Sequence, residues 1–196
     1  MTDLTRRVLL ITPALLLIPR ALKAAGTARI EEAGEGGSLI RNGESQPLTT
    51  GQQVIEGDTV LTGPNGLALL ILPDETRINI GADSAVLAKS LGTAPALHIT
   101  GLAGVTQQTG SAGELLIETP LATIAQRGGR SFIGTAGARP GVLVQTGSAL
   151  VQNETGSRVL QPGQGVDLVV DEPLGEVSAW GEARVAEAWK SVGLTP

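Results

Sequence analysis

The sequence lacks several residue types on which common protein chemistries depend. Its 196 residues include no cysteine and one histidine, and only 2% of them are aromatic. The absence of cysteine excludes disulfides, thiolate zinc sites, iron–sulfur clusters and cysteine nucleophiles. His98 stands alone, so any metal site that needs two imidazoles is excluded as well. We predict no metal ion and no cofactor.

Charge is also scarce, because only 17% of the residues are charged. An average soluble domain has roughly 25%, and disordered chains are usually richer in charge, so a folded chain is expected. The net charge is −5, and no dense run of Lys and Arg follows the first residues. Nucleic acid is therefore not an expected partner. The length suits one domain with a core of its own.

The N-terminus has the pattern of an export signal. Arg6 and Arg7 precede an apolar run over residues 8–18. As a helix this run spans roughly 16 Å, about half of a bilayer's hydrocarbon core. The small residues Ala24 and Ala25 follow, as expected before a signal-peptidase site. We predict a cleavable signal and a protein located in the periplasm.

The export route stays open between two alternatives. The segment from Thr5 to Leu10 resembles the twin-arginine motif, and the same arginines also suit an ordinary Sec signal. Cleavage after residue 24 removes four basic residues and one acidic residue, which leaves a net charge of −8. Such a chain is not expected to bind anionic lipid headgroups. No later segment is long and apolar enough to span a membrane, so no span is expected after cleavage.

From about residue 27 to 170 the pattern is that of short strands. Runs of four to seven residues rich in Val, Ile, Leu and Thr end in Gly, Pro, Asn or Asp. In the run 76–80, Ile78 and Ile80 alternate with polar residues, which is typical of a half-buried strand. Pro64-Asn65-Gly66 suits a turn between two such runs. The predicted class is all-β, with short strands stacked as in a β-solenoid or a sandwich.

An internal repeat supports the stacked arrangement. Residues 100–110 and 146–156 align without a gap, and six of the eleven positions are identical. Each copy is predicted to be an apolar strand, a Thr-Gly turn, a second strand and another Thr-Gly turn. The alternative is chance similarity between turns rich in Gly and Thr. If the repeat is structural, each unit buries its apolar face against the next.

A helix is expected at the C-terminus, over residues 178–193. Ser178 suits its start and Gly193 its end, while Val185, Trp189 and Val192 fall on one face. We expect this helix to cap one end of the stack, where strand edges are otherwise exposed. Trp180 is nine residues before Trp189, a spacing that would put the two indoles on opposite faces of a helix. Therefore either Trp180 precedes the regular helix or one indole is exposed for a contact.

Several motifs in order resemble FecR-like domains. The resemblance begins with the Gly-Asp turn, strand and Thr-Gly turn of residues 51–63. It continues over the segments 69–80, 82–84, 117–128, 142–150 and 160–166. It departs from the family at Asp74-Glu75-Thr76, where Asp-Gly-Ser is usual, and at residues 127–132, where Arg-Gly-Thr usually precedes a Phe. FecR-type regulators carry a cytoplasmic anti-sigma segment and a membrane span, so their transmembrane signalling is not carried over to a chain with a cleavable signal.

The predicted organisation therefore has four parts. They are an export signal at 1–24, a linker and first strand at 25–44, a FecR-like β domain at 45–170, and a linker with the helix at 171–196.

We found no catalytic constellation in the sequence. Asp74 could form a pair of carboxylates with Glu75, Asp58 or Asp83 for acid–base catalysis. All four residues also suit polar turns at the surface, which is the interpretation we favour. His98 lies between Leu97 and Ile99, so in a strand it faces away from both. The Gly-rich segment 33–38 has no Lys and does not lead from a strand into a helix, so it suits a turn rather than a phosphate loop. We predict no enzyme and no catalytic, cofactor or metal residues.

Two functions follow for such a chain. The first is a non-enzymatic binding or scaffold module of the FecR type that acts in the periplasm on an envelope or periplasmic protein. The second is a module that binds cell-envelope glycan such as peptidoglycan. Sugar sites often stack on aromatic rings, and this chain offers only Phe132, Trp180 and Trp189.

Overall fold

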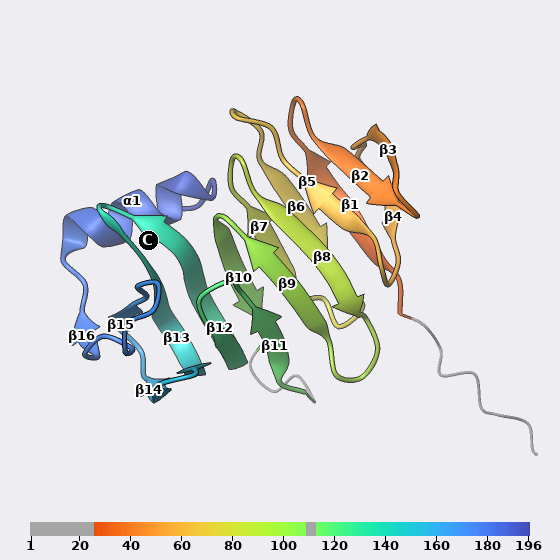
Figure 1. Ribbon diagram of the computed structural model, residues 1–196. Coiled ribbons are helices and arrows are strands. Elements are labelled where there is room, and N and C mark those ends of the chain that lie inside the picture. Colours follow the sequence, from red (N-terminus) through yellow and green to blue (C-terminus); the bar gives the residue numbers. More distant parts are fainter. Residues whose placement is uncertain (1–25, 109–112) are drawn as a thin grey trace, which may run out of the picture.

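The computed structural model describes residues 26–108 and 113–196. In these ranges the chain forms sixteen strands joined in one strongly curled sheet, followed by a single helix (Figure 1). The predicted all-β class with a C-terminal helix is confirmed. The predicted signal at residues 1–24 lies outside the described residues. No helix in the described ranges has the length and apolar character needed to cross a membrane.

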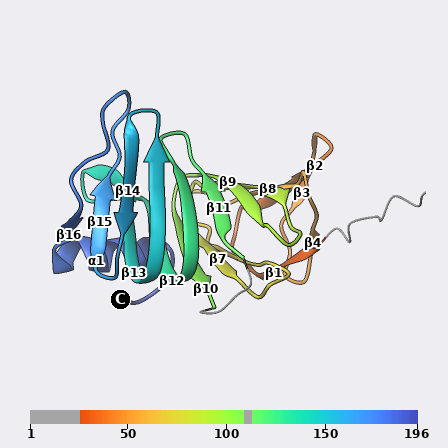
Figure 2. The same cartoon turned by 90° about the horizontal axis from the view of Figure 1, so that it is seen from below.

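The sheet folds back on itself, so that two layers face each other, as Figure 2 shows from below. The first layer consists of β3 (Glu44–Pro47), β2 (Ser38–Arg41), β5 (Thr59–Leu61), β8 (Ala85–Ser90), β9 (Ala96–Thr100) and β11 (Leu115–Glu118). The second layer consists of β4 (Gln53–Val54), β1 (Ala28–Ala33), β6 (Ala68–Ile71), β7 (Arg77–Ile80) and β10 (Ala103–Gln107). Ile, Val and Leu side chains of both layers meet in one main core, because alternate residues of each strand point inward.

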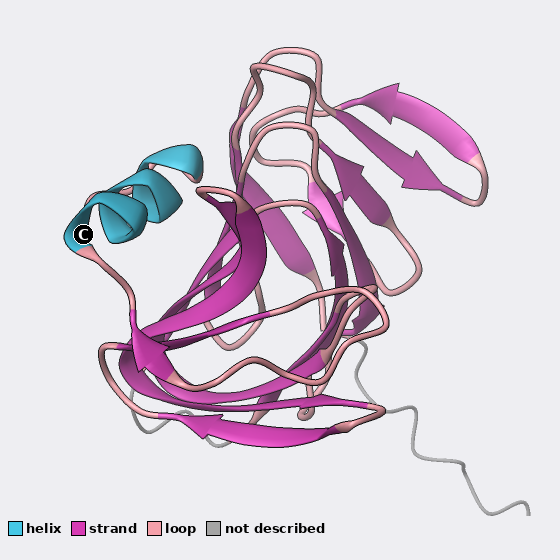
Figure 3. Ribbon diagram, turned by 60° about the vertical axis from the view of Figure 1, so that its left-hand side comes forward, coloured by secondary structure: helices cyan, strands magenta, loops and turns pink. Residues whose placement is uncertain are grey.

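Two long strands join the layers. The first half of β12 (Thr123–Ala136) pairs with β11 of the first layer, and its second half pairs with β10 of the second layer. β13 (Arg139–Asn153) runs back along the whole of β12. Figure 3 shows how sharply these two strands curve. They therefore carry the sheet continuously from one layer to the other.

The curve is made at three glycines, Gly128, Gly129 and Gly147, which we call the bend. All three have positive φ angles, of 63°, 78° and 79°, which residues with a Cβ rarely adopt. The ladder between β12 and β13 shifts its register at this point. A Cβ on Gly147 would lie 2.1 Å from the carbonyl oxygen of Gly128, so the two strands approach too closely for a side chain.

Buried polar side chains hold the bend. Gln107 accepts a hydrogen bond from the N–H of Gly128 at 2.8 Å, and Gln126 donates one to the carbonyl of Gly129 at 3.2 Å. The hydroxyl of Ser131 donates to the amide oxygen of Gln126. These three side chains are almost fully buried, and their bonds satisfy polar groups that would otherwise be costly to bury.

The internal repeat has a geometric basis that differs from the predicted one. Gly101 (φ 103°) lies between β9 and β10, where the chain passes from the first layer to the second. Gly147 is instead a bend within the continuous strand β13, which passes from the second layer to the first. The prediction of a turn between separate strands is thus wrong for the second copy, although both Thr-Gly pairs change layers. Gly110, in the second Thr-Gly pair of the first copy, lies outside the described residues.

The segment 25–44, predicted as a linker with one strand, contributes β1, β2 and the first residue of β3. β1 pairs with both β4 and β6, so it is an internal strand of the second layer. The Gly-rich segment forms the connection from β1 to β2, as predicted. β2 and β3 form a hairpin around Asn42 and Gly43, both at positive φ, as a tight type I′ turn requires.

The last strands and the helix complete the fold. β14 (Gly156–Leu160) extends the first layer beyond β13. β15 (Gln164–Asp167) pairs with the second-layer half of β13, and β16 (Ser178–Ala179) pairs with β15. The helix α1 spans Glu182–Ser191, shorter than the predicted 178–193 at its start, because residues 178 and 179 belong to β16. Trp180 precedes the helix, and Gly193 (φ 73°) ends it as predicted.

The expected end cap is not the helix. The connection from β15 to β16 closes the C-terminal end of the stack, since Leu168 and Leu174 are buried in the main core. The helix instead packs on the outer face of the sheet, the face away from that core, where it meets Phe132 and Leu143. Both residues alternate with inward-facing neighbours on β12 and β13, so the two faces of the same strands support two separate cores.

Candidate functional site

The carboxylates considered for acid–base chemistry lie in turns, and Asp74 and Glu75 share one of them. Asp74 accepts hydrogen bonds from the N–H and the hydroxyl of Thr76, at 3.1 and 2.9 Å, and so shapes the turn between β6 and β7. Glu75 and Asp83 have positive φ angles of 63° and 49°. In the described ranges no group of three His, Cys, Asp or Glu side chains is placed to hold a metal ion.

Asp58 is the one buried carboxylate among them. It pairs with Arg41 in a two-pronged contact in which Nε donates at 2.8 Å, and it also accepts the N–H of Ile55 at 2.8 Å. Burial by itself raises the pKa of Asp58, but the hydrogen bonds from Arg41 and Ile55 outweigh it and leave this pKa below its ordinary value. Asp58 thus stays ionised as a structural anchor for the loop between β4 and β5.

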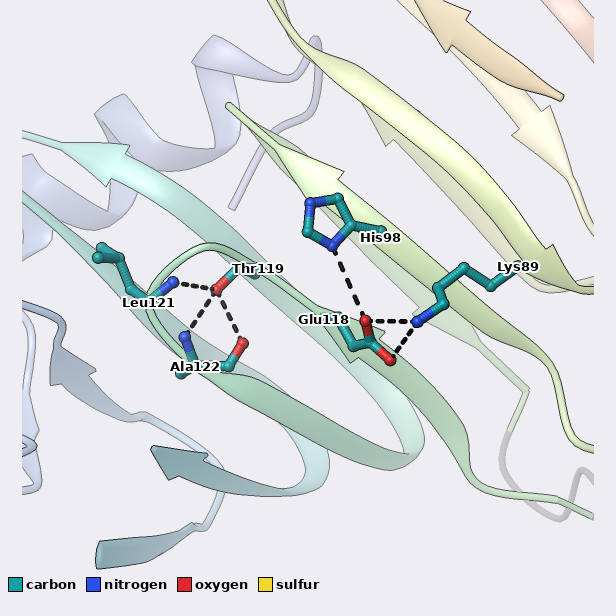
Figure 4. Close-up of polar contacts among 6 residues, drawn as sticks. All are labelled: Lys89, His98, Glu118, Thr119, Leu121 and Ala122. Carbon is teal, nitrogen blue, oxygen red and sulfur yellow. Dashed lines mark hydrogen bonds and ion pairs between the residues drawn. The ribbon is translucent and has the colours of Figure 1, made fainter. Parts of the chain in front are cut away.

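His98 lies on the outer face of the first layer, opposite the buried Leu97 and Ile99 as predicted. Lys89, His98 and Glu118 cross three neighbouring strands there (Figure 4). Lys89 donates to both oxygens of Glu118 at 2.7 Å, and His98 Nδ1 lies 3.9 Å from the nearer oxygen. The hydrogen bond from Lys89 lowers the pKa of Glu118. This exposed trio is a cross-strand charge cluster of the kind that adds modest stability to a sheet.

All three aromatic residues lie in the second core. Phe132 and Trp189 are fully buried and Trp180 is 9% exposed. Phe132 meets both indoles edge to face, with ring centroids 6.4 and 6.3 Å apart. None of them is available to stack on a sugar.

Two arginines, which the sequence analysis did not single out, close the second core. The guanidinium of Arg130 lies 4.0 Å from the ring centroid of Trp189, and that of Arg184 lies 3.5 Å from Trp180. Arg184 also donates to the carbonyl of Ala136 at 3.0 Å and forms an ion pair with Asp167 at 2.7 Å. Desolvation by burial lowers the pKa of Arg130. The cation–π pair of Arg130 with Trp189 therefore holds α1 on β12, while Arg184 holds it through the hydrogen bond to Ala136 and the ion pair with Asp167.

The free edges of the sheet differ in how far they are protected. β4 and β16 have two residues each. β3 is exposed along its length, but it carries Glu44 and ends at Pro47, and charge and proline both discourage pairing at an edge. β14 has five residues and, among the described strands, pairs only with β13. It is therefore the most open edge of the described sheet.

An exposed apolar pair lies beside this edge. Leu150 of β13 and Val159 of β14 are direct partners in the ladder, and they are 39% and 57% exposed. Their inward-facing neighbours Val151 and Leu160 are buried in the main core. The pair thus lies on the outer face, on the two outermost strands of the first layer.

A groove of about 820 Å³ lies at the tip of the hairpin between β13 and β14. It is lined by the turn between β11 and β12, by the hairpin, and by the start of the connection after β15. Thr119 shapes the first of these turns, accepting the N–H groups of Leu121 and Ala122 at 3.2 and 3.0 Å and donating to the carbonyl of Ala122 (Figure 4). The charged residues of the lining are all acidic: Glu154, Asp171 and Glu172.

Comparison with known families finds one match. Residues 58–150 match the model of the family described as FecR protein. This segment runs from the residue before β5 to Leu150 in β13 and is similar to the FecR family, as the sequence motifs indicated. No curated protein matches the chain. The sheet itself extends beyond the matched segment on both sides, from β1 to β16.

Two solved structures share the fold. Both are described as a putative anti-sigma factor from Parabacteroides distasonis ATCC 8503, and each aligns with a TM-score of 0.54. The sequence identities are 15% and 16%, and each alignment covers 65% of this chain and 61% of the other. The chain thus spans about three fifths of those chains, and at this identity the likeness concerns the fold.

Proposed function

We propose that the chain is a non-enzymatic binding module that is exported to the periplasm and acts there on an envelope or periplasmic protein. The observation that carries the proposal is the open edge of β14 beside the exposed pair Leu150 and Val159. The match to the FecR family over residues 58–150, and a fold shared with proteins described as putative anti-sigma factors, support a regulatory role for that binding. The edge of β14 and the exposed pair offer a surface for contact with a protein. The buried carboxylate of Asp58, in contrast, stabilises a loop of the chain itself.

Export is tested by the N-terminus of the native protein. Mass spectrometry of the periplasmic fraction should find a chain that begins at Ala25 or Gly26, because the signal ends in small residues. Replacing both Arg6 and Arg7 by Lys should block export on the twin-arginine route and leave it unchanged on the Sec route. A chain that keeps residues 1–24 in the membrane fraction would contradict the periplasmic location.

Protein binding is tested by cross-linking in the native host. A photoreactive residue is placed in turn at Ser157 on β14, at Leu87 on the outer face of β8, and at Glu187 on α1. We expect a discrete protein adduct from at least one position, identified by mass spectrometry. Purified peptidoglycan, incubated with the same protein, should leave it in the supernatant because the three aromatic rings are buried. Co-sedimentation with peptidoglycan and no protein adduct would reverse the assignment.

A further inference from the structure

We infer that the edge of β14 takes an extended segment of a partner protein that is apolar at alternate positions and ends in Lys or Arg. The inference rests on the proposed function for the claim that the chain binds a protein. It adds the place, the conformation and the chemistry of the bound segment. Three features carry it: an open edge, an apolar pair beside that edge, and an acidic groove at one end of it.

The edge supplies main-chain hydrogen bonds. In an antiparallel ladder the N–H and C=O groups of alternate residues point away from the paired strand. β14 pairs with β13 on one side, so part of its N–H and C=O groups face outward. An added strand would satisfy these groups without regard to its sequence, as in other cases of β-strand addition.

The exposed apolar pair supplies side-chain selectivity. Leu150 and Val159 lie side by side on the outer face. A third strand beside β14 would place its own outward-facing side chains next to Val159, at the distance of cross-strand neighbours. Val or Ile at those positions would extend the apolar row and remove Val159 from water. The bound segment should therefore alternate apolar and polar residues.

The groove determines the direction in which the bound segment runs and the charge at its end. It lies at the hairpin that precedes β14, and its three charged residues, Glu154, Asp171 and Glu172, are acidic. Antiparallel pairs outnumber parallel pairs two- to threefold. A strand antiparallel to β14 has its C-terminal end beside that hairpin, so the basic residues should be at that end.

Charge also argues against a second copy of this chain as the occupant. The chain has a net charge of −5, and a second copy would present the same acidic groove. The one basic residue of β14 is Arg158, whose guanidinium donates to the carbonyl of Leu174 at 3.4 Å, in the connection that closes the stack. Its charge is engaged on the inner side of the sheet and does not complement a second groove.

The test uses three fluorescein-labelled peptides of eight residues. One alternates Thr and Val and ends in two Lys, the second carries the two Lys at its start, and the third ends in two Glu. Fluorescence anisotropy with the purified protein should give the tightest binding for the first peptide, roughly tenfold tighter than for the third, and a loss of this preference at high salt. Equal binding of the first and third peptides, or no binding of any, would overturn the inference.

Variants locate the site. Val159→Lys should weaken binding of the first peptide at least tenfold, while Ile55→Lys should leave it unchanged. Ile55 is 42% exposed and follows β4, near the opposite end of the sheet, so it is a matched control. The combined change Glu154→Gln, Asp171→Asn and Glu172→Gln should abolish the preference for Lys over Glu. Equal losses in the two Lys variants would also overturn the inference.

The host cross-linking experiment separates this inference from the proposed function. An adduct from Ser157 supports both. An adduct only from Leu87 or Glu187 keeps protein binding and refutes the β14 site. The absence of any protein adduct refutes the proposed function itself.

Discussion

Replacing Gly147 by Ala tests whether the bend determines the fold. The new Cβ would lie 2.1 Å from the carbonyl oxygen of Gly128 and 3.0 Å from Cα of Gly129. Both neighbours are backbone atoms of β12, so no side-chain rotation relieves the overlap. β12 and β13 would have to separate by about 1 Å at their centre to restore an ordinary contact.

The expected loss of stability in Gly147→Ala has two parts. An L-residue at the φ of 79° found for Gly147 costs about 1–2 kcal/mol. The forced separation of two paired strands costs about 1–3 kcal/mol more, as in an overpacked core. We therefore expect the free energy of unfolding to fall by about 2–5 kcal/mol, a large part of the roughly 5–15 kcal/mol typical of a domain.

Gly163→Ala is the matched control. Its φ is 83°, close to that of Gly147, but no atom lies within 4 Å of its Cβ position. It carries the backbone cost alone, offset by the reduced freedom of the unfolded chain, so we expect a loss of about 1 kcal/mol or less. Urea denaturation followed by circular dichroism measures both. Equal losses in the two variants would refute the account of the bend as a steric requirement.

Three further predictions concern positions outside the bend. Glu75→Gly should raise the melting temperature by about 2–4 °C in a thermal scan, because Glu75 holds a φ of 63° and about 1 kcal/mol of strain is relieved; an unchanged or lower melting temperature would contradict this. Asp58→Asn should flatten the acid side of the stability curve in urea titrations at pH 7, 5 and 3. The folded pKa of Asp58 is lowered, so its contribution is complete above the unfolded value near 4 and is lost as the pH falls; a curve as steep as that of the parent would count against it. Deleting residues 178–196 should cause self-association in size-exclusion chromatography, since Phe132 and Leu143 become exposed; a monomer of unchanged stability would show that α1 is dispensable.

Much of the fold could be predicted from local patterns. The alternation at Ile78 and Ile80 predicted a half-buried strand, and both side chains are buried in the main core. The helix face of Val185, Trp189 and Val192 was also predicted, and all three residues belong to the second core or pack against it. These predictions succeeded because period and capping are properties of neighbouring residues.

The layer assignment could not be predicted in the same way. Neighbouring strands in the sheet are often distant in the sequence: β1 pairs with β6, and β2 with β5. Nothing in the sequence of β12 or β13 distinguishes a bend within a strand from a turn between two strands, since both use Gly at positive φ. The hairpin at Asn42 and Gly43 was missed despite a signal, because Asn-Gly is the strongest short hairpin motif.

The exposed apolar pair and the two arginines of the second core could not be predicted from the sequence, for a different reason. Leu150 and Val159 each stand next to an apolar residue that is buried, Val151 and Leu160, and the sequence does not show which member of each pair faces the core. Their exposure follows from the register with which β14 pairs with β13 at the margin of the sheet. The role of Arg130 and Arg184 likewise depends on the placement of α1 against the outer face. Such contacts arise from tertiary packing.

The two separate cores divide the molecule into units that should open independently. The second core consists of α1, Trp180 and one outer face of β12 and β13, while the opposite face of those strands belongs to the main core. Fluctuations that lift α1 away leave the main core buried, so the amides of residues 182–191 should exchange with deuterium through a partial opening. The amides of β12 and β13 near the bend should exchange only when the whole domain unfolds.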